Sequence, residues 1–373
     1  MVPQVILIGY YGRMNFGDDI LMAAAWRIAA QLMPGASRAI RTGTDLDYPS
    51  RLLGEPVPRI GFGTRDRHEL ILHGGGGTFF DFAAHPPQRR LRNALLLGAG
   101  AGPFVRAEGA LRRLVGRPRI SAKRRLGLGI GVGTYSAGSS RLLEALPVLE
   151  DFDALWLRDP ASATNLARLG VAPHVVAGSD MAFLHEHWCP EPLLLRPPAR
   201  RGPRPKLGVI LRDWPSGSGE AFAWSLWPVL ERLSARCDLT LFSLDPFADA
   251  GTLRALGMLN ARVWRPDRHD LVSFLEELAG QDAFVTARAH GAICAACLGR
   301  ASVILEIEPK LRAVHDMLPR ATRLAAVDSD AATLGALIDE VLDIPVPMIA
   351  QDVTANREAS RRALDEVSAR CGA

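Results

Sequence analysis

The sequence predicts a two-domain α/β protein with a parallel sheet in each domain and a cleft between them. Short apolar runs of strand type alternate with helical patterns along the chain, and such alternation with right-handed crossovers gives parallel sheets. The chain has 373 residues, of which 48% are hydrophobic. That is enough for two cores, because single cores rarely grow past about 250 to 300 residues. Residues 190–205 are rich in Pro and Arg and lack periodicity, which is typical of a stiff, exposed linker.

These observations divide the chain into four parts. We expect an N-terminal domain at residues 1–190, a linker at 191–205, a C-terminal domain at 206–345 and a final helix within 346–373. The final helix is one that could fold back across the first domain. The functional cleft is expected between the two domains.

The composition is that of an enzyme rather than a nucleic-acid-binding protein. The formal net charge is +4, and charged residues of both signs make up 23% of the chain. The number of cysteines is odd, which fits a reducing compartment better than a disulfide framework: they are Cys189, Cys237, Cys294, Cys297 and Cys371. Cys294 and Cys297 spell C-x-x-C, but they lie among alanines and are interpreted as small, buried helix residues. We therefore expect no metal site and no cofactor.

The N-terminal sequence and the hydropathy predict a cytoplasmic protein. The first residues enter a strand almost at once, without a basic region followed by an apolar one, so no signal peptide is expected. The sequence contains no run of about 18 apolar residues without a charge, the length that a membrane-spanning helix needs.

The excess positive charge is concentrated in residues 106–125. Eight basic residues there face Glu108 alone: Arg106, Arg112, Arg113, Arg117, Arg119, Lys123, Arg124 and Arg125. A solvated basic face is one interpretation. Peripheral contact with anionic lipid at the inner face of the membrane, or with a lipid-phosphate-linked substrate, is the other.

The chain begins with a strand, a polar turn and a helix. Residues 5–10 form the strand and 20–32 the helix, and the turn between them contains Asn15, Gly17, Asp18 and Asp19. Helix capping should use one of the two acids, leaving the other, with Asp18 preferred, free to face the cleft. The turn lacks the glycine spacings of dinucleotide and P-loop folds, so neither NAD nor ATP is inferred.

A second strand at residues 69–73 leads into four consecutive glycines, Gly74, Gly75, Gly76 and Gly77, followed by Asp81. Such a run predicts a loop in which a ligand or another backbone must touch the chain. Further strands are expected at 126–132, 154–158 and 175–176, with helices at 142–149 and 160–170. Arg158 lies at the end of one of these strands.

The second domain shows the same alternation. Strands are expected at 207–211, 239–243, 261–264, 284–286, 301–307 and 324–327. Helices are expected at 221–235, near 250–258, near 269–279, and at 292–298, 331–342 and 353–369. Arg288 and His290 lie in the turn after one strand, and Glu306, Glu308 and Lys310 follow the next. Ligands of open α/β sheets bind at the carboxyl ends of strands, so this edge predicts a site for a phosphate or a carboxylate.

Four segments together resemble the polysaccharide pyruvyl transferase family: GYYGRMNFGDD, HGGGGTFFDF, WLRDPASATNLARLGV and ARAHGAICAACLGRASVILEIEPK. The resemblance implies two Rossmann-like domains in a GT-B-like arrangement. It also implies transfer of a pyruvyl group from phosphoenolpyruvate to a sugar of a polysaccharide or its lipid-linked precursor, with formation of a ketal. The family commonly has Leu-His after the arginine, whereas this chain has Ala289, whose side chain we expect to point away from the ligand.

The residue types suit this chemistry. Arg158, Arg288, Lys310 and Arg212 can hold the phosphate and carboxylate of the donor. His290 is the best proton carrier, since histidine changes charge near neutral pH. On the acceptor side we expect the turn and glycine residues named above, with Asp81.

Two other interpretations stay open. One is a GT-B glycosyltransferase using a nucleotide sugar, and the other is a non-catalytic carbohydrate-binding relative.

Overall fold

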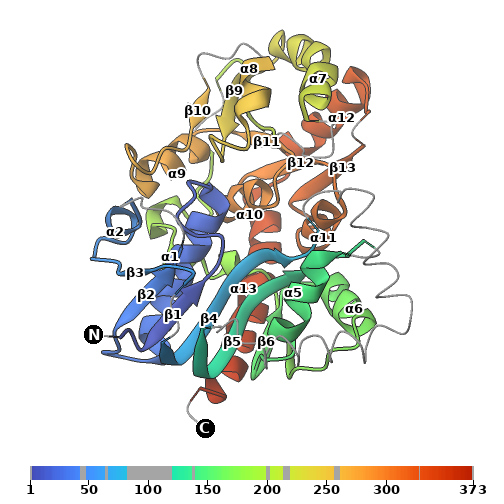
Figure 1. Ribbon diagram of the computed structural model, residues 1–373. Coiled ribbons are helices and arrows are strands. Elements are labelled where there is room, and N and C mark those ends of the chain that lie inside the picture. Colours follow the sequence, from blue (N-terminus) through green and yellow to red (C-terminus); the bar gives the residue numbers. More distant parts are fainter. Residues whose placement is uncertain are drawn as a thin grey trace.

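The computed structural model describes residues 2–42, 48–63, 66–81, 120–136, 139–198, 202–212, 219–255, 261–326 and 328–371. These residues form two lobes, each built on a parallel sheet (Figure 1). The predicted pair of parallel-sheet α/β domains is therefore confirmed. The boundary between them stays a prediction.

The first sheet has strand order β3-β2-β1-β4-β5-β6-β7, and all its pairs are parallel. Its strands are β1 (Val5–Ile8), β2 (Arg38–Arg41), β3 (Arg59–Ile60), β4 (Arg67–Phe79), β5 (Ser121–Val132), β6 (Ala154–Leu157) and β7 (Val175–Ala177). The helices of this part are α1 (Phe16–Leu32), α2 (Tyr48–Leu53), α5 (Ser140–Leu149) and α6 (Pro160–Arg168). The short turns η1 (Met181–Phe183), η2 (His185–His187) and η3 (Glu191–Leu193) follow. β2, β3 and α2 were not foreseen from the sequence.

The second sheet has strand order β10-β9-β8-β11-β12-β13, again parallel throughout. Its strands are β8 (Lys206–Ile210), β9 (Asp238–Ser243), β10 (Arg262–Val263), β11 (Ala283–Thr286), β12 (Ala301–Leu305) and β13 (Thr322–Ala325). Its helices are α7 (Gly219–Ser234), α8 (Ala250–Ala255), α9 (Leu271–Ala279), α10 (Ala289–Cys297), α11 (Pro309–Met317) and α12 (Ala331–Leu342). Successive residues of central strands, such as Val5, Ile6 and Leu7, are fully buried. Burial of both faces of a strand is the expected consequence of helices covering both sides of a parallel sheet.

The last helix, α13 (Val346–Ala369), returns to the first lobe and packs against β6, β7, η1 and α10. In Figure 1 it runs down behind the first sheet toward the C-terminus. It begins at Val346, seven residues earlier than the predicted 353. Pro345 is the N-cap residue of α13, and Pro347 lies in its first turn, where a proline is tolerated.

Two local predictions are wrong. The four glycines do not follow a strand as a loop but lie within β4, with positive φ angles of 34° at Gly75 and 85° at Gly76. Asn15, and neither of the acids, caps α1 by accepting from the backbone N–H of Asp18 at 3.3 Å. Within the described part of the predicted linker, Leu193 is buried whereas Glu191 and Pro192 are exposed, and the linker stays a prediction.

Most of the basic stretch, residues 106–119, lies outside the described residues. Of its described part, Arg125 is not solvated: it is 8% exposed and bonds to Asp151 at 2.9 Å and to His73 at 2.7 Å. Lys123 forms an exposed ion pair with Glu69 at 2.7 Å. Within the described ranges no helix is long and apolar enough to cross a bilayer.

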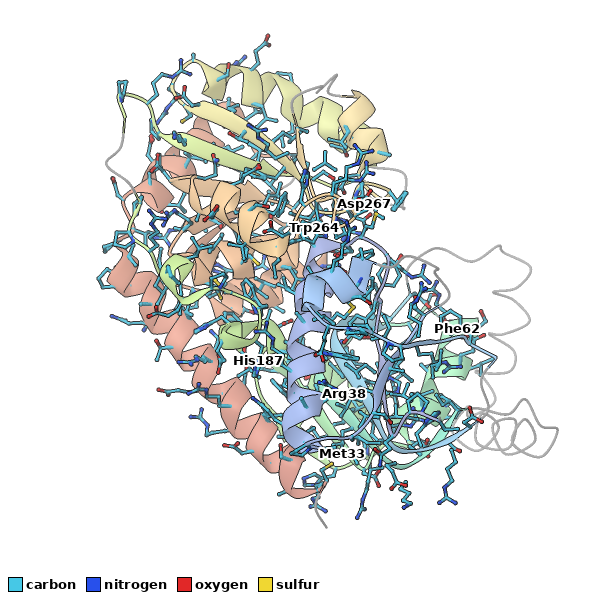
Figure 2. All side chains as sticks on the ribbon, turned by 90° about the vertical axis from the view of Figure 1, so that its left-hand side faces the viewer. Met33, Arg38, Phe62, His187, Trp264 and Asp267 are labelled. Atoms are coloured by element: carbon cyan, nitrogen blue, oxygen red, sulfur yellow. The ribbon has the colours of Figure 1, made fainter. Side chains whose placement is uncertain are left out.

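The buried carboxyl group of Asp19 joins the two lobes. It accepts from the Tyr48 hydroxyl at 2.8 Å and from the indole N–H of Trp264 at 2.7 Å. Trp264 follows β10 of the second sheet and lies above the N-terminal end of α1 (Figure 2). Burial raises the pKa of Asp19 to about 7, against the lowering effect of these two hydrogen bonds.

We predict that Trp264→Phe lowers the melting temperature more at pH 8 than at pH 6. The substitution removes a donor from a buried carboxyl group, a loss of about 1 to 3 kcal/mol. The folded-state pKa of Asp19 already exceeds that of an unfolded aspartate, and losing the donor raises it further. The added cost therefore appears where the group ionises, above pH 7.

The matched control is Trp188→Phe, which removes a 2.8 Å hydrogen bond to the neutral carbonyl of Ala182. It should lower the melting temperature equally at both pH values. If calorimetry gave the same pH dependence of the melting temperature for both variants, Trp264 would not be the donor that stabilises ionised Asp19.

Candidate active site

A cleft of about 610 Å³ lies between the lobes. Its volume is within the range of about 300 to 1,000 Å³ usual for small-molecule sites. It opens at the carboxyl ends of the strands, because residues following β1, β6, β8, β9, β11 and β12 reach it. Its charged lining residues are Arg13, Asp18, Arg141, Arg158, Arg212, Asp245, Arg288, His290 and Lys310.

Most of the residues predicted for the site line this cleft. From the predicted catalytic and donor sets these are His290, Asp18, Arg158, Arg288, Lys310 and Arg212, and from the loop set Asn15, Gly17, Gly75 and Gly77. Asp19, Gly74, Gly76 and Asp81 are not among the lining residues. Asp19 bonds to Trp264 and Tyr48, as described above, and a Cβ on Gly74 would meet the Tyr11 hydroxyl.

Asp81 and Ala289 also differ from expectation. The Asp81 carboxylate accepts from the backbone and hydroxyl of Ser136 at 2.7 and 2.5 Å and from the Ser139 hydroxyl at 2.5 Å, so it holds a loop together. Ala289 was expected to point away from the ligand, yet it lines the cleft. A leucine at that position would reach further into the cleft than alanine does.

His290 lies in the first turn of α10, between the two lobes. Its imidazole packs against the backbone of α1, where a Cβ on Gly17 would lie 2.7 Å from the ring atom Cγ. Its Nε2 is 3.8 Å from Asp180 Oδ1, too far for a hydrogen bond, and has no hydrogen-bond partner among the described residues. The side chain is 15% exposed, which leaves it accessible from the cleft.

The cations on the second lobe are each paired with a buried acid. Arg288 bonds to Asp249, and its Nε is buried without a hydrogen-bond partner in the described part of the chain. Glu308 Oε1 accepts from Arg212 Nη1 at 3.0 Å and from Lys310 Nζ at 2.7 Å. Burial lowers the pKa of Lys310 to about 8, against the raising effect of Glu308.

Arg158 is the member of the predicted donor set that belongs to the first lobe. It follows β6 and is 5% exposed, with Nε 3.1 Å from Asp159 and Nη1 3.3 Å from Asp180. A Cβ on Gly131 of β5 would lie 2.7 Å from its Nε, so the glycine makes room for the guanidinium. Internal carboxylates thus orient every cation of the predicted donor set.

The opposite wall of the cleft carries acids and an exposed aromatic ring. Burial raises the pKa of Asp18 to about 6, and the facing His290 acts against that rise. Asn15 donates from Nδ2 to Asp245 at 3.0 Å, which ties the turn before α1 to the segment after β9. Tyr10 is 48% exposed at this wall, with the Arg13 guanidinium 4.5 Å from the centre of its ring.

Sequence reasoning missed the acids that hold the cations, chiefly Asp180 and Asp249, and the wall residues Tyr10 and Asp245. Asp180 and Asp245 follow β7 and β9, so the rule that sites form at strand ends could have found them. Asp249 carried no such signal. Within the described ranges, no group of three His, Cys, Asp or Glu side chains is placed to hold a metal ion.

Comparison with known proteins assigns the family. The model of the family described as polysaccharide pyruvyl transferase matches residues 15–309. The chain belongs to the polysaccharide pyruvyl transferase family. No curated protein matches the chain.

Solved structures show the fold. UDP-GlcNAc 2-epimerase from Methanocaldococcus jannaschii is 10% identical with a TM-score of 0.55, covering 98% of this chain and 99% of that one. The S. aureus MnaA–UDP complex is 11% identical with a TM-score of 0.54, covering 97% and 95%. UDP-GlcNAc 2-epimerase from Neisseria meningitidis bound to UDP-GlcNAc is 10% identical with a TM-score of 0.50, covering 97% and 98%. These similarities confirm the predicted GT-B-like arrangement of two Rossmann-like domains.

We predict that Gly17→Ala lowers kcat by up to about 100-fold, because the added methyl group displaces the His290 ring, and misplacement by about 1 Å can cost that much. The change in helix propensity should not lower the melting temperature, because alanine favours a helix more than glycine does. The control is Gly335→Ala in α12, where the nearest atom, Arg236 Nη1, would be 3.6 Å away. Unchanged kcat in Gly17→Ala would show that the contact with His290 is unimportant.

Proposed function

We propose that the protein transfers the pyruvyl group of phosphoenolpyruvate to two hydroxyls of a sugar, forming a pyruvate ketal and releasing phosphate. One observation carries the proposal. The side chains of Arg158, Arg212, Arg288 and Lys310 line the same cleft as His290. Four cations around one cleft favour an anionic donor substrate.

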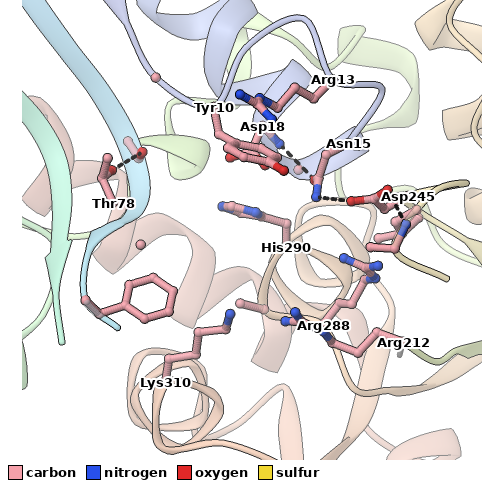
Figure 3. A pocket seen from close by; sticks show the side chains of 18 of the residues that line it. Tyr10, Arg13, Asn15, Asp18, Thr78, Arg212, Asp245, Arg288, His290 and Lys310 are labelled. Carbon is pink, nitrogen blue, oxygen red and sulfur yellow. Dashed lines mark hydrogen bonds between the residues drawn. The ribbon is translucent and has the colours of Figure 1, made fainter. Parts of the chain in front are cut away.

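The donor end of the cleft is the end with the cations. Arg212, Arg288 and Lys310 point into the same space below His290 in Figure 3. Phosphoenolpyruvate carries a phosphate and a carboxylate, and the planar fork of arginine suits both. Because the acids behind these cations hold them in place, little conformational freedom is lost when the donor binds.

His290 lies between this end and the wall formed by Tyr10 and Asp18 (Figure 3). The reaction begins when a proton is added to the methylene carbon of the donor, which makes the adjacent carbon cationic. A sugar hydroxyl attacks that carbon, phosphate leaves, and a second hydroxyl takes its place. An imidazole near neutral pH can supply the first proton.

The proton balance calls for a base as well. Two hydroxyls lose protons; one of these ends on the new methyl group and the other on phosphate. Asp18 is suited to accept a hydroxyl proton, since its raised pKa makes it a stronger base than an ordinary aspartate while leaving it ionised at neutral pH. The exposed ring of Tyr10 on the same wall offers an apolar face to a sugar ring. The acceptor is therefore a saccharide held at this wall.

The test is turnover of phosphoenolpyruvate with a panel of lipid-linked and nitrophenyl glycosides, measured by phosphate release and by mass gain of the sugar. Wild-type protein should release phosphate with an acceptor. His290→Ala should lose about 10²- to 10⁴-fold in rate with donor affinity within a few-fold. Arg288→Lys should instead weaken donor binding by roughly 10- to 100-fold, the loss of a two-pronged charged contact.

The outcomes separate the alternatives. Binding of a nucleotide diphosphate sugar, with none of phosphoenolpyruvate, would favour a glycosyltransferase and overturn the proposal. Full turnover by His290→Ala would overturn the role of the histidine alone.

We predict that kcat/KM falls as the pH drops through about 6, because Asp18 is then protonated. Asp18→Asn should have a low kcat/KM without this acid limb. The pKa of Asp18 is raised from 3.8 to about 6 on folding, so stability falls as the pH rises between these values and the full cost is present at pH 8. The Asn variant should therefore melt no lower than wild type at pH 8, since Asn15 caps the helix.

Asp339→Asn, at an exposed position on α12, is the control and should match wild type in kcat/KM at every pH. If Asp18→Asn kept both the rate and the acid limb of wild type, the base would have to be sought elsewhere.

A further inference from the structure

Asp180 lies beneath the cleft rather than in its lining. It follows β7 and is fully buried, and its Oδ1 accepts from the backbone N–H of Ala182 at 3.0 Å, which caps η1. The same carboxylate faces Arg158 Nη1 at 3.3 Å and His290 Nε2 at 3.8 Å. A single acid thus contacts a cation of the first lobe and the histidine of the second.

The carboxylate is held ionised. Burial alone would raise the pKa of Asp180, but His290 and Arg158 outweigh burial and keep it below its ordinary value. The other charged residues that line the cleft with His290 are Arg13, Asp18, Arg141, Arg158, Arg212, Asp245, Arg288 and Lys310. Among the described residues, Asp180 is the acid that lies within ion-pair distance of the imidazole, at 3.8 Å.

Helix α13 fixes the segment that carries this acid. Asn356 Oδ1 accepts from the Ser179 hydroxyl at 2.6 Å, and its Nδ2 donates to the carbonyl of Met317 at 2.7 Å. The Ser360 hydroxyl donates to the backbone carbonyl of Asp180 at 3.2 Å. Polar contacts on both sides of the Asp180 peptide therefore come from the last helix of the chain.

We propose that Asp180, held by α13, is a positioning residue that sets His290 and Arg158 in their working arrangement. The inference rests on the proposed function and extends it. Both neighbours of the imidazole belong to the first lobe: Gly17 of α1 packs against the ring, and Asp180, which follows β7, faces its Nε2. Because the histidine belongs to one lobe and the acid to the other, the contact also couples proton delivery to the relative position of the lobes.

The experiment compares Asp180→Asn with Asp159→Asn, using phosphoenolpyruvate and an acceptor that wild type converts. Asp159 accepts from Arg158 Nε at 3.1 Å and caps α6 by accepting from the backbone N–H of Ser162 at 2.6 Å. It forms no ion pair with His290 among the described residues. Asparagine can keep either cap. We expect Asp180→Asn to lower kcat by about 10- to 100-fold, the scale of a misplaced catalytic group. Asp159→Asn should raise the KM for phosphoenolpyruvate a few-fold and keep kcat.

The result that overturns the inference is equal kcat in the two variants. If Asp180→Asn does not fold, Asn356→Ala loosens the same segment from outside the cleft. It should lower kcat by a larger factor than it raises the KM for phosphoenolpyruvate, because the loosened acid faces both His290 and Arg158; unchanged kcat there also overturns the inference. Failure of the proposed function looks different, since wild-type protein would then release no phosphate from phosphoenolpyruvate.

Discussion

The buried carboxyl group of Asp19 is the joint on which the cleft depends. An acid without solvent must find donors, and it finds one in each lobe: the Tyr48 hydroxyl and the Trp264 indole. The neighbouring backbone N–H of Phe16 bonds to the carbonyl of Leu244 at 2.8 Å, and the Phe16 ring packs against Trp264 with centroids 5.2 Å apart. These contacts bring the start of α1 to the end of β9. The next acid, Asp18, is thereby placed in the cleft.

The charges around the cleft follow from the cost of burying them. Arg158, Arg288 and the pair Arg212 and Lys310 each have an internal carboxylate, because a buried charge without a partner costs several kcal/mol. Even so, the buried Nε of Arg288 has no hydrogen-bond partner among the described residues. Donors that are held in place before the substrate binds can stabilise charge that develops during a reaction.

The fold and the chemistry are separate matters in this protein. Its solved structural neighbours include UDP-GlcNAc 2-epimerases at 10 to 11% identity, which shows a shared architecture and nothing about substrate. What distinguishes this chain is the set of side chains at the strand ends. Arg288, His290 and Lys310 follow two adjacent strands, β11 and β12, and the parallel sheet brings them to one edge. The proposed donor site is therefore a consequence of topology acting on local sequence.

The sequence by itself determined the alternation of strands and helices, the two parallel sheets and most of the cleft lining, because periodicity and strand-end position are local properties. It foresaw the positions of Arg158, Arg288 and His290 for that reason. Only the tertiary structure decided that the glycines continue β4, where they pair with β5, and that Asp180 lies between Arg158 and His290. Those outcomes depend on partners up to 110 residues away, as in the pair Asp180 and His290. Such pairings are set by how the two sheets dock, and no local pattern records that.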